Sequence, residues 1–255
     1  MTAVKRAAIA LLLLLALGCS AGTPEAGPTA TPAPTASPTA TPTPTPTGDG
    51  CPARTVLPRG SVLSVIGDSY TSGEAGKGGV GERGWPAILA RRLGWTVYND
   101  AHGGSGYLGQ VLPDRTYDGP LFIDQVPKLR TQHPDLVIVF GSDNDRTYGA
   151  APLAAKTRET LAAVKRAAPA AQLIVATTFL HEDEPPPDLD RVRDVARAET
   201  ARVPCAVFVD PMAEHWFSSA TTSLFFPNDD HPTDAGHARL AALWQRTLTR
   251  LGYVD

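Results

Sequence analysis

Short apolar runs alternate with helical patterns from Ser61 to the last residues of the chain. The apolar runs are rich in branched and aromatic residues and occupy residues 61–66, 95–98, 136–140, 173–177 and 206–210. The helical segments occupy residues 85–93, 121–130, 151–168, 189–202 and 234–251. Pro127 counts against a continuous helix in the second of these segments. Strands that are apolar on both faces are typical of a parallel sheet covered by helices on both sides. We therefore predict a doubly wound α/β fold, with its site at the carboxyl ends of the strands.

The first 18 residues have the pattern of a secretion signal. Lys5 and Arg6 precede an apolar stretch at residues 7–17, and small residues follow before Cys19. Leu17-Gly18-Cys19 resembles the lipobox of bacterial lipoproteins, although alanine precedes it where leucine is commoner. The resemblance implies that residues 1–18 are removed and that a lipid on Cys19 anchors the protein to the extracellular face of the cell membrane. The alternative is an ordinary signal peptide, an incidental cysteine and a secreted protein.

Residues 19–50 follow as a low-complexity segment of Thr-Pro, Ala-Pro and Ser-Pro repeats. Such sequence buries little apolar surface and lacks many backbone donors, so we expect a disordered, extended stalk. The remaining residues, 51–255, are enough for one α/β domain with its own core. The formal net charge is −3 and the basic residues form no stripe, so we do not expect nucleic acid as a partner.

Two cysteines remain if Cys19 carries a lipid. Cys51 opens the folded domain, and Cys205 precedes the last apolar run. An even number of cysteines in an oxidising compartment favours one disulfide between them. The alternative is a pair of free thiols.

Two polar clusters directly follow the first two apolar runs. In residues 67–73, Ser69 lies at a strand-to-helix turn, where its hydroxyl is exposed and its N–H can face a developing oxyanion. Residues 99–106 contain three glycines, which let backbone amides approach a ligand closely. Each cluster alone is equally well interpreted as a capped turn or a flexible loop.

Two further clusters follow the third apolar run and precede the last helix. In residues 142–145, the side-chain amide of Asn144 can donate to an oxyanion, although an Asx turn is the simpler interpretation. In the fourth cluster, His231 lies in a loop and is free to act as a base, while Asp234 is expected to cap the helix.

Taken in order, Gly-Asp-Ser, the glycine loop, Asn-Asp and His-Pro resemble the sequence blocks of the SGNH (GDSL-like) hydrolase superfamily. The resemblance covers residues 61–251, nearly all of the predicted domain. It implies a flavodoxin-like fold and the hydrolysis of esters with neither metal nor cofactor. It assigns the nucleophile to Ser69 and the base to His231.

The same resemblance assigns an oxyanion hole. Its donors are the N–H groups of Ser69 and Gly104 and the side-chain amide of Asn144, with Gly106 as the second choice of glycine. Ser142 stands where the family usually has glycine.

A second departure concerns the carboxylate that orients the histidine. The family usually places an aspartate three residues before the histidine, and Asn228 occupies that position. Asp229 is our choice for the orienting residue, because a rearranged turn would let it reach Nδ1 of His231. A backbone carbonyl is the alternative, and both Asp229 and Asp230 are also compatible with a solvated acidic loop.

These residues predict a serine esterase that acts on carboxylic esters, with short O-acyl groups as the favoured substrates. Acylated polysaccharides suit a stalked surface enzyme, whereas lipid esters and acyl transfer stay open. The rival hypothesis is a catalytically dead scaffold of the cell envelope, which the asparagine at position 228 keeps open.

Other motifs favour simpler interpretations. Lys77 lies in Gly-Lys-Gly, but the Ser or Thr of a phosphate-binding loop does not follow it. Residues 181–184 are acidic and favour a solvated loop over a cation site. His231 and His237 are six residues apart with no third matching ligand, so we expect no zinc and a structural role for His237 in the last helix.

Overall fold

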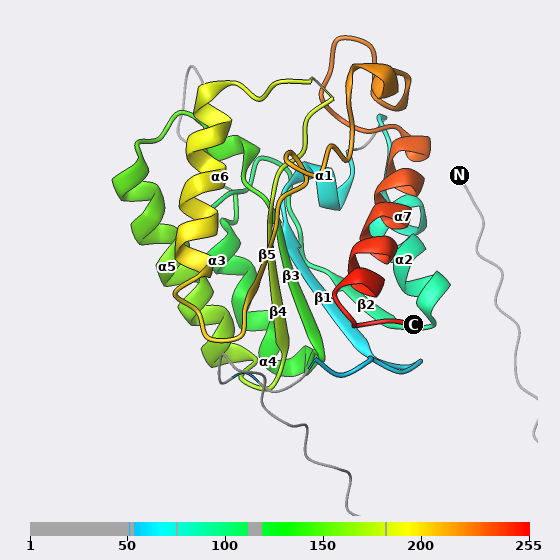
Figure 1. Cartoon of the computed structure of the whole chain (residues 1–255), viewed down its shortest axis with the longest axis vertical. Helices are drawn as coiled ribbons and strands as arrows, with labels where there is room; N and C mark the ends of the chain where they lie inside the picture. The colour runs from blue at the N-terminus through cyan, green and yellow to red at the C-terminus, as the bar shows by residue number, and fades with distance from the viewer. Residues whose placement is uncertain (1–50, 52–53, 75, 112–118, 182) are drawn as a thin grey trace, which may run out of the picture. The chain divides into compact units, whose positions relative to one another are not determined.

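The predicted apolar runs form one parallel five-stranded sheet (Figure 1). The computed structural model describes residues 51, 54–74, 76–111, 119–181 and 183–255. The strands are β1 (Val62–Gly67), β2 (Thr96–Asn99), β3 (Leu136–Gly141), β4 (Gln172–Thr177) and β5 (Val207–Val209). Their order is β2-β1-β3-β4-β5, and each neighbouring pair is parallel. This is the flavodoxin-like order, which confirms the predicted doubly wound fold.

Helices cover both faces of the sheet. On one face lie α2 (Trp85–Leu93) and α7 (Asp234–Arg250). On the other face lie α3 (Phe122–Gln125), α4 (Leu129–Gln132), α5 (Ala150–Ala167) and α6 (Pro187–Thr200). Figure 1 shows the two helical layers with the sheet between them.

The side chains of β3 show why its sequence is apolar throughout. Leu136, Ile138 and Phe140 join the core beneath α2 and α7, whereas Val137 and Val139 join the core beneath α5 and α6. All five are fully or almost fully buried. Because successive strand residues point to opposite faces, a strand covered on both sides needs apolar residues at every position.

The helix predicted at residues 121–130 is interrupted. It consists of α3, a 3-10 turn at Val126–Lys128 that contains Pro127, and α4. Proline has no N–H to donate and its ring clashes with the preceding helical turn, so the α-helix cannot continue through it.

Cys51 and Cys205 form the predicted disulfide, with their Cα atoms 5.4 Å apart. The bridge ties the beginning of the domain to the segment before β5. The predicted signal peptide, Cys19 and the stalk lie outside the described residues. Among the residues that are described, no helix is long and apolar enough to cross a membrane.

Candidate active site

The loops after β1 and β3 and the loop before α7 line a cavity of about 280 Å³. Parallel strands bring their carboxyl ends to one edge of the sheet, which explains why segments so distant in sequence meet there. The lining residues are Asp68, Ser69, Tyr70, Gln110, Asp143, Asn144, Asp229, Asp230 and His231. Three of the four polar clusters predicted from the sequence therefore contribute to one cavity.

Ser69 is the first residue of α1 (Ser69–Ser72), the short helix that follows β1. Asp68 caps this helix, and its carboxylate accepts a hydrogen bond from the Tyr70 N–H at 3.0 Å. Gly67 permits the turn, because a Cβ there would lie 2.8 Å from the Phe140 carbonyl oxygen. The first turn of a helix has no helical carbonyl for its N–H groups, so the Ser69 N–H is suited to bind an anion.

His231 lies between Ser69 and Asp229. Its Nε2 is 2.8 Å from Ser69 Oγ, and its Nδ1 is 2.5 Å from Asp229 Oδ1. The same Asp229 oxygen accepts the backbone N–H of His231 at 2.9 Å. The ring edge of Tyr70 packs against the imidazole at 5.3 Å between centroids. A serine hydroxyl, an imidazole and a carboxylate therefore lie in the contact order of a Ser-His-Asp triad.

Asn228 explains how the carboxylate reaches the ring from a position two residues before the histidine. It adopts a φ of 59°, in the left-handed region that asparagine tolerates better than most residues. The Asp229 N–H then donates to the Phe226 carbonyl at 3.1 Å, and the Phe226 N–H donates to the His231 carbonyl at 3.1 Å. The turn therefore presents the carboxylate at position 229, one residue after the position at which the family usually has it.

Asn144 lies in the 3-10 turn after β3 and faces the glycine loop. Its Nδ2 donates to the Ser105 carbonyl at 2.8 Å, which occupies one of the two N–H groups of the amide. The neighbouring buried Asp145 holds the same loop in place. It accepts hydrogen bonds from three consecutive backbone N–H groups at 2.8–2.9 Å, those of Tyr107, Leu108 and Gly109.

Ser142 occupies a position where glycine would be unstrained. Its φ is 88°, and a non-glycine residue in this region pays about 1–2 kcal/mol. Two hydrogen bonds offset that cost, from its N–H to Asp68 Oδ2 at 3.0 Å and from its hydroxyl to Asp145 Oδ2 at 2.5 Å. The hydroxyl, which glycine lacks, thus forms its hydrogen bond within the third cluster, whereas the backbone N–H links that cluster to the first.

Gly104 lies in the glycine loop with a φ of 76°. Its neighbour Gly103 faces Ser69, because a Cβ at Gly103 would lie 3.8 Å from Ser69 Cβ. Gly106, the second choice for an oxyanion donor, packs against Asp145, where a Cβ would lie 2.6 Å from Oδ1. Close packing alone thus accounts for glycine at position 106.

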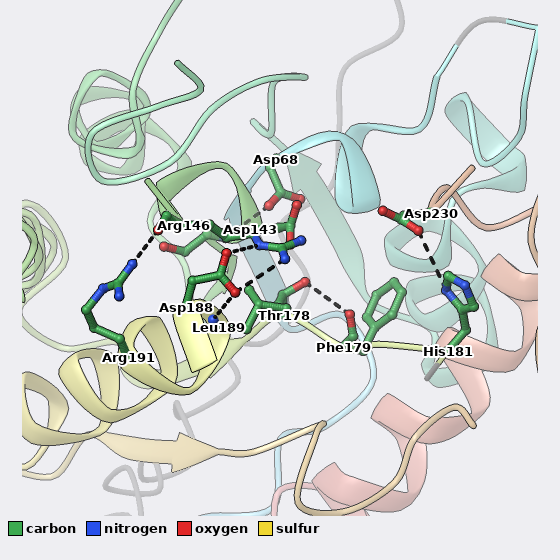
Figure 2. A network of polar contacts seen from close by, with 11 residues as sticks. Asp68, Asp143, Arg146, Thr178, Phe179, His181, Asp188, Leu189, Arg191 and Asp230 are labelled. Atoms are coloured by element: carbon green, nitrogen blue, oxygen red, sulfur yellow. Dashed lines mark hydrogen bonds and ion pairs between the residues drawn. The ribbon is translucent and has the colours of Figure 1, made fainter. Parts of the chain in front are cut away.

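The cavity is acidic, and the pKa values of its carboxyl groups are shifted in different directions. Burial raises the pKa of Asp68 to about 7, although hydrogen bonds from Ser142 and Tyr70 oppose the rise. Burial also raises the pKa of Asp143 to about 6, against the opposing charge of Arg146. Figure 2 shows Arg146 between Asp143 and Asp188, at 3.7 Å and 2.9 Å respectively.

Asp229 differs from these two groups. Its burial would raise its pKa, but the hydrogen bond from Lys77 and those from the backbone and ring of His231 lower it to about 2. Asp229 is therefore a carboxylate at neutral pH. Asp230, by contrast, is mostly exposed and lies 3.8 Å from His181 Nδ1 (Figure 2).

Two side chains beside His231 were not predicted as parts of the site. Glu74 Oε2 lies 3.0 Å from His231 Nε2, and Lys77 Nζ lies 3.0 Å from Glu74 Oε1 and 2.6 Å from Asp229 Oδ2. The Gly-Lys-Gly motif suggests only a phosphate-binding loop for Lys77, and the residues that follow it exclude that loop. The glycines around these two residues indicate a tight turn, but they do not indicate its contact with the His231 loop.

His237 is buried in α7 and accepts the Trp85 N–H at Nδ1 over 3.4 Å. Burial lowers its pKa to about 4, so it is neutral at neutral pH and serves packing. In the part of the chain that the structure describes, no group of three or more His, Cys, Asp or Glu side chains is suited to hold a metal ion.

The prediction that Asp234 caps α7 is wrong. Thr233 is the N-cap, and its side chain accepts the Gly236 N–H at 3.2 Å. Asp234 instead accepts the Gly79 N–H at 2.9 Å and pairs with Arg83 at 2.9 Å. Its carboxylate therefore ties the loop after α1 to the beginning of α7.

Comparison with known proteins assigns the family. A model of the GDSL-like lipase/acylhydrolase family matches residues 65–239. The GDSL lipase Rv0518 of Mycobacterium tuberculosis is 38% identical over 208 residues, which cover 75% of this chain and 85% of that protein. The family two carbohydrate esterase from Clostridium thermocellum, solved with cellohexaose, has a TM-score of 0.62 and 19% identity over 81% of this chain and 69% of its own. The family two carbohydrate esterase from Cellvibrio japonicus has a TM-score of 0.60 and 17% identity over 80% and 63%. At these identities the two structures support the fold alone. The chain belongs to the GDSL-like lipase/acylhydrolase family and is an SGNH-type hydrolase of the esterase/lipase kind.

Proposed function

We propose that this protein is a serine esterase that uses Ser69 as nucleophile, His231 as general base and Asp229 as the carboxylate that orients the base. The observation that carries the proposal is the continuous contact from Ser69 Oγ to His231 Nε2 at 2.8 Å and from Nδ1 to Asp229 at 2.5 Å. Asp229 accepts the Nδ1 proton, so Nε2 keeps the lone pair that the reaction needs.

The reaction has two halves. Ser69 Oγ attacks the ester carbonyl while its proton passes to His231 Nε2, and His231 then gives that proton to the leaving alkoxide. In the second half, His231 takes a proton from the water that attacks the acyl carbon, the bond to Ser69 Oγ breaks, and His231 returns the proton to Oγ as the carboxylic acid leaves. The N–H groups of Ser69 and Gly104 and the free N–H of the Asn144 amide stabilise the oxyanion in both halves.

The favoured substrates are short O-acyl groups on a hydroxyl-rich alcohol. The cavity volume of about 280 Å³ lies near the lower end of the usual range for ligand pockets, about 300–1,000 Å³. Carboxylates make up much of the cavity lining. Hydroxyl groups can donate to Asp143 and Asp230, whereas a long acyl chain would find little apolar surface there. The carbohydrate esterases of similar fold support an acylated polysaccharide as the alcohol.

Labelling of the purified protein with a fluorophosphonate tests the mechanism. We expect one label per chain, none in Ser69→Ala, and full labelling in Ser72→Ala, which removes a hydroxyl from the same short helix. No labelling of the wild type would favour the dead-scaffold hypothesis, whereas equal labelling of wild type and Ser69→Ala would assign the reactive nucleophile to another residue. A series of p-nitrophenyl esters from acetyl to palmitoyl then tests the chain length, with kcat/KM expected to fall as the chain grows.

We further propose that the protein is held at the extracellular face of the cell membrane by a lipid on Cys19. The basic residues, apolar stretch and small residues before Cys19 support this. A Cys19→Ala protein should leave the membrane fraction, and firm retention of that variant would contradict the anchor.

A further inference from the structure

We propose that Glu74 and Lys77 are positioning residues that set the charge around the catalytic histidine. Glu74 stabilises the imidazolium form of His231, and Lys77 binds the carboxylates of both Glu74 and Asp229. This proposal rests on the serine-esterase mechanism given above. The two residues close a ring of contacts: His231 to Asp229, Asp229 to Lys77, Lys77 to Glu74, and Glu74 back to His231.

The backbone holds the pair firmly beside the ring. The Glu74 N–H donates to the Gly78 carbonyl at 3.0 Å, and the Lys77 N–H donates to the Glu74 carbonyl at 3.0 Å. A Cβ at Gly78 would lie 2.8 Å from the Asp234 nitrogen, so this turn packs directly on the beginning of α7. His231 precedes the same helix. The turn that carries Glu74 and Lys77 and the loop that carries His231 therefore both adjoin the beginning of α7.

The position of Glu74 determines which state of the histidine it favours. Its Oε2 is 3.0 Å from Nε2, the same atom that accepts the proton of Ser69. A carboxylate attracts an N–H at this distance and repels a lone pair. Glu74 therefore stabilises the imidazolium that forms when the serine attacks, from the side opposite Asp229.

A second carboxylate alone would also hold the resting histidine in its protonated, inactive form. Lys77 prevents this, because its ammonium contacts the outer oxygen of each carboxylate. Glu74, Lys77 and Asp229 together carry one negative charge, since two carboxylates and one ammonium sum to −1. A standard triad has the same charge from its single aspartate.

The other titratable groups around the histidine keep their identity when this pair is varied, although Lys77→Met also removes a hydrogen bond that lowers the pKa of Asp229. These groups are Asp68, Tyr70, Asp143, Asp229, Asp230 and His237. Glu74→Gln leaves the contact between Lys77 and Asp229 in place, so the difference between that variant and the wild type reports on Glu74 itself.

The test is the pH dependence of kcat/KM on p-nitrophenyl acetate for Glu74→Gln and Lys77→Met in the full chain. We expect the acid limb of the profile, where kcat/KM falls as the base becomes protonated, to move by about one pH unit in each variant. It should move to lower pH in Glu74→Gln, which removes a negative charge, and to higher pH in Lys77→Met, which removes a positive charge. The plateau kcat of Glu74→Gln should fall about 10-fold, which corresponds to one such unit, with KM little changed. The double variant restores the charge of −1, so its limb should return close to that of the wild type.

Matched controls come from α5, where Lys156 pairs with Glu159 at 2.8 Å with the same spacing of three residues. Lys156→Met and Glu159→Gln should leave the limb in place. The proposal would be overturned if the acid limbs of kcat/KM for both test variants coincided with that of the wild type. It would also be overturned if both limbs moved in the same direction. Glu74→Gln preserves the side-chain shape, so it carries the test even if Lys77→Met is unstable. A wild type without esterase activity or Ser69 labelling would instead refute the mechanism on which the proposal rests.

Discussion

Asp229→Asn is the sharpest test of the site, because the surroundings of Asp229 allow no harmless orientation of the amide. Asp229 Oδ1 accepts two N–H groups of His231, and Oδ2 contacts the Lys77 ammonium at 2.6 Å. An asparagine has one oxygen and one NH₂ group, so it can satisfy either Lys77 or His231 but not both.

The attraction of Lys77 for oxygen turns the NH₂ group of this asparagine toward the histidine. Nδ1 must then act as an acceptor, which places the ring proton on Nε2, where it faces the Ser69 hydroxyl. That tautomer cannot accept the serine proton. We therefore expect kcat to fall by about 10⁴, the loss seen when the orienting aspartate of a serine protease becomes asparagine.

The assay is steady-state hydrolysis of p-nitrophenyl acetate at neutral pH, with Asp230→Asn as the matched control. Asp230 lies next in the sequence and lines the same cavity, but it is mostly exposed and its carboxylate lies near His181 and not His231. Alanine at the two positions should give the same contrast, with a far greater loss at position 229. A kcat for Asp229→Asn equal to that of Asp230→Asn would refute the reasoning and favour a Ser-His dyad oriented by a backbone carbonyl.

Three further predictions follow from the geometry. Asn144→Ala should lower kcat by roughly 10²–10³ if its amide donates to the oxyanion, and a normal kcat would assign that role elsewhere. Replacing Cys51 and Cys205 by serine should lower the free energy of unfolding by up to roughly 5 kcal/mol, as measured by denaturant titration, and an unchanged midpoint would contradict a stabilising bridge. The pKa of Asp68 is about 7 in the folded protein and 3.8 by itself, so the stability that this group contributes is complete below pH 3.8 and is lost as the pH rises through 7. The wild type should therefore lose up to about 4 kcal/mol relative to Asp68→Asn between pH 4 and pH 8, and parallel stability curves would show that Asp68 does not titrate there.

The strands β1, β3, β4 and β5 and the long helices were predictable from the sequence because each buries a regular apolar pattern, whereas β2 is an edge strand whose residues are mostly exposed. The helix predicted at residues 85–93 has those bounds as α2, and α7 begins at the predicted Asp234. The short elements were not predictable. The 3-10 turn at Ser219–Leu224 is polar and rests on local hydrogen bonds of Ser218 and Thr221, which leave no periodic signal.

The site was predictable as far as it depends on strand ends. Ser69, Asn144 and His231 follow strands or precede a helix, so the topology alone brings them together. Glu74 and Lys77 were not predictable, because their contacts with the His231 loop span more than 150 residues of sequence. Those contacts depend on how a glycine turn packs on α7, which no local pattern determines.

Asn228→Asp tests whether Asp229 completes the triad or orients His231 less well than an aspartate at position 228 would. Restoring the family's aspartate would raise activity if Nδ1 lacked a carboxylate. In this structure Nδ1 already has Asp229 at 2.5 Å, and position 228 has a φ of 59° that serves to bring Asp229 there. A new carboxylate at position 228 would add negative charge beside a histidine whose charge balance is already met by Asp229, Glu74 and Lys77. We therefore expect no gain in kcat and an acid limb of kcat/KM at higher pH, because the added charge favours the imidazolium. A large gain in kcat would show that Asp229 orients the ring poorly and that the family's position is the better one.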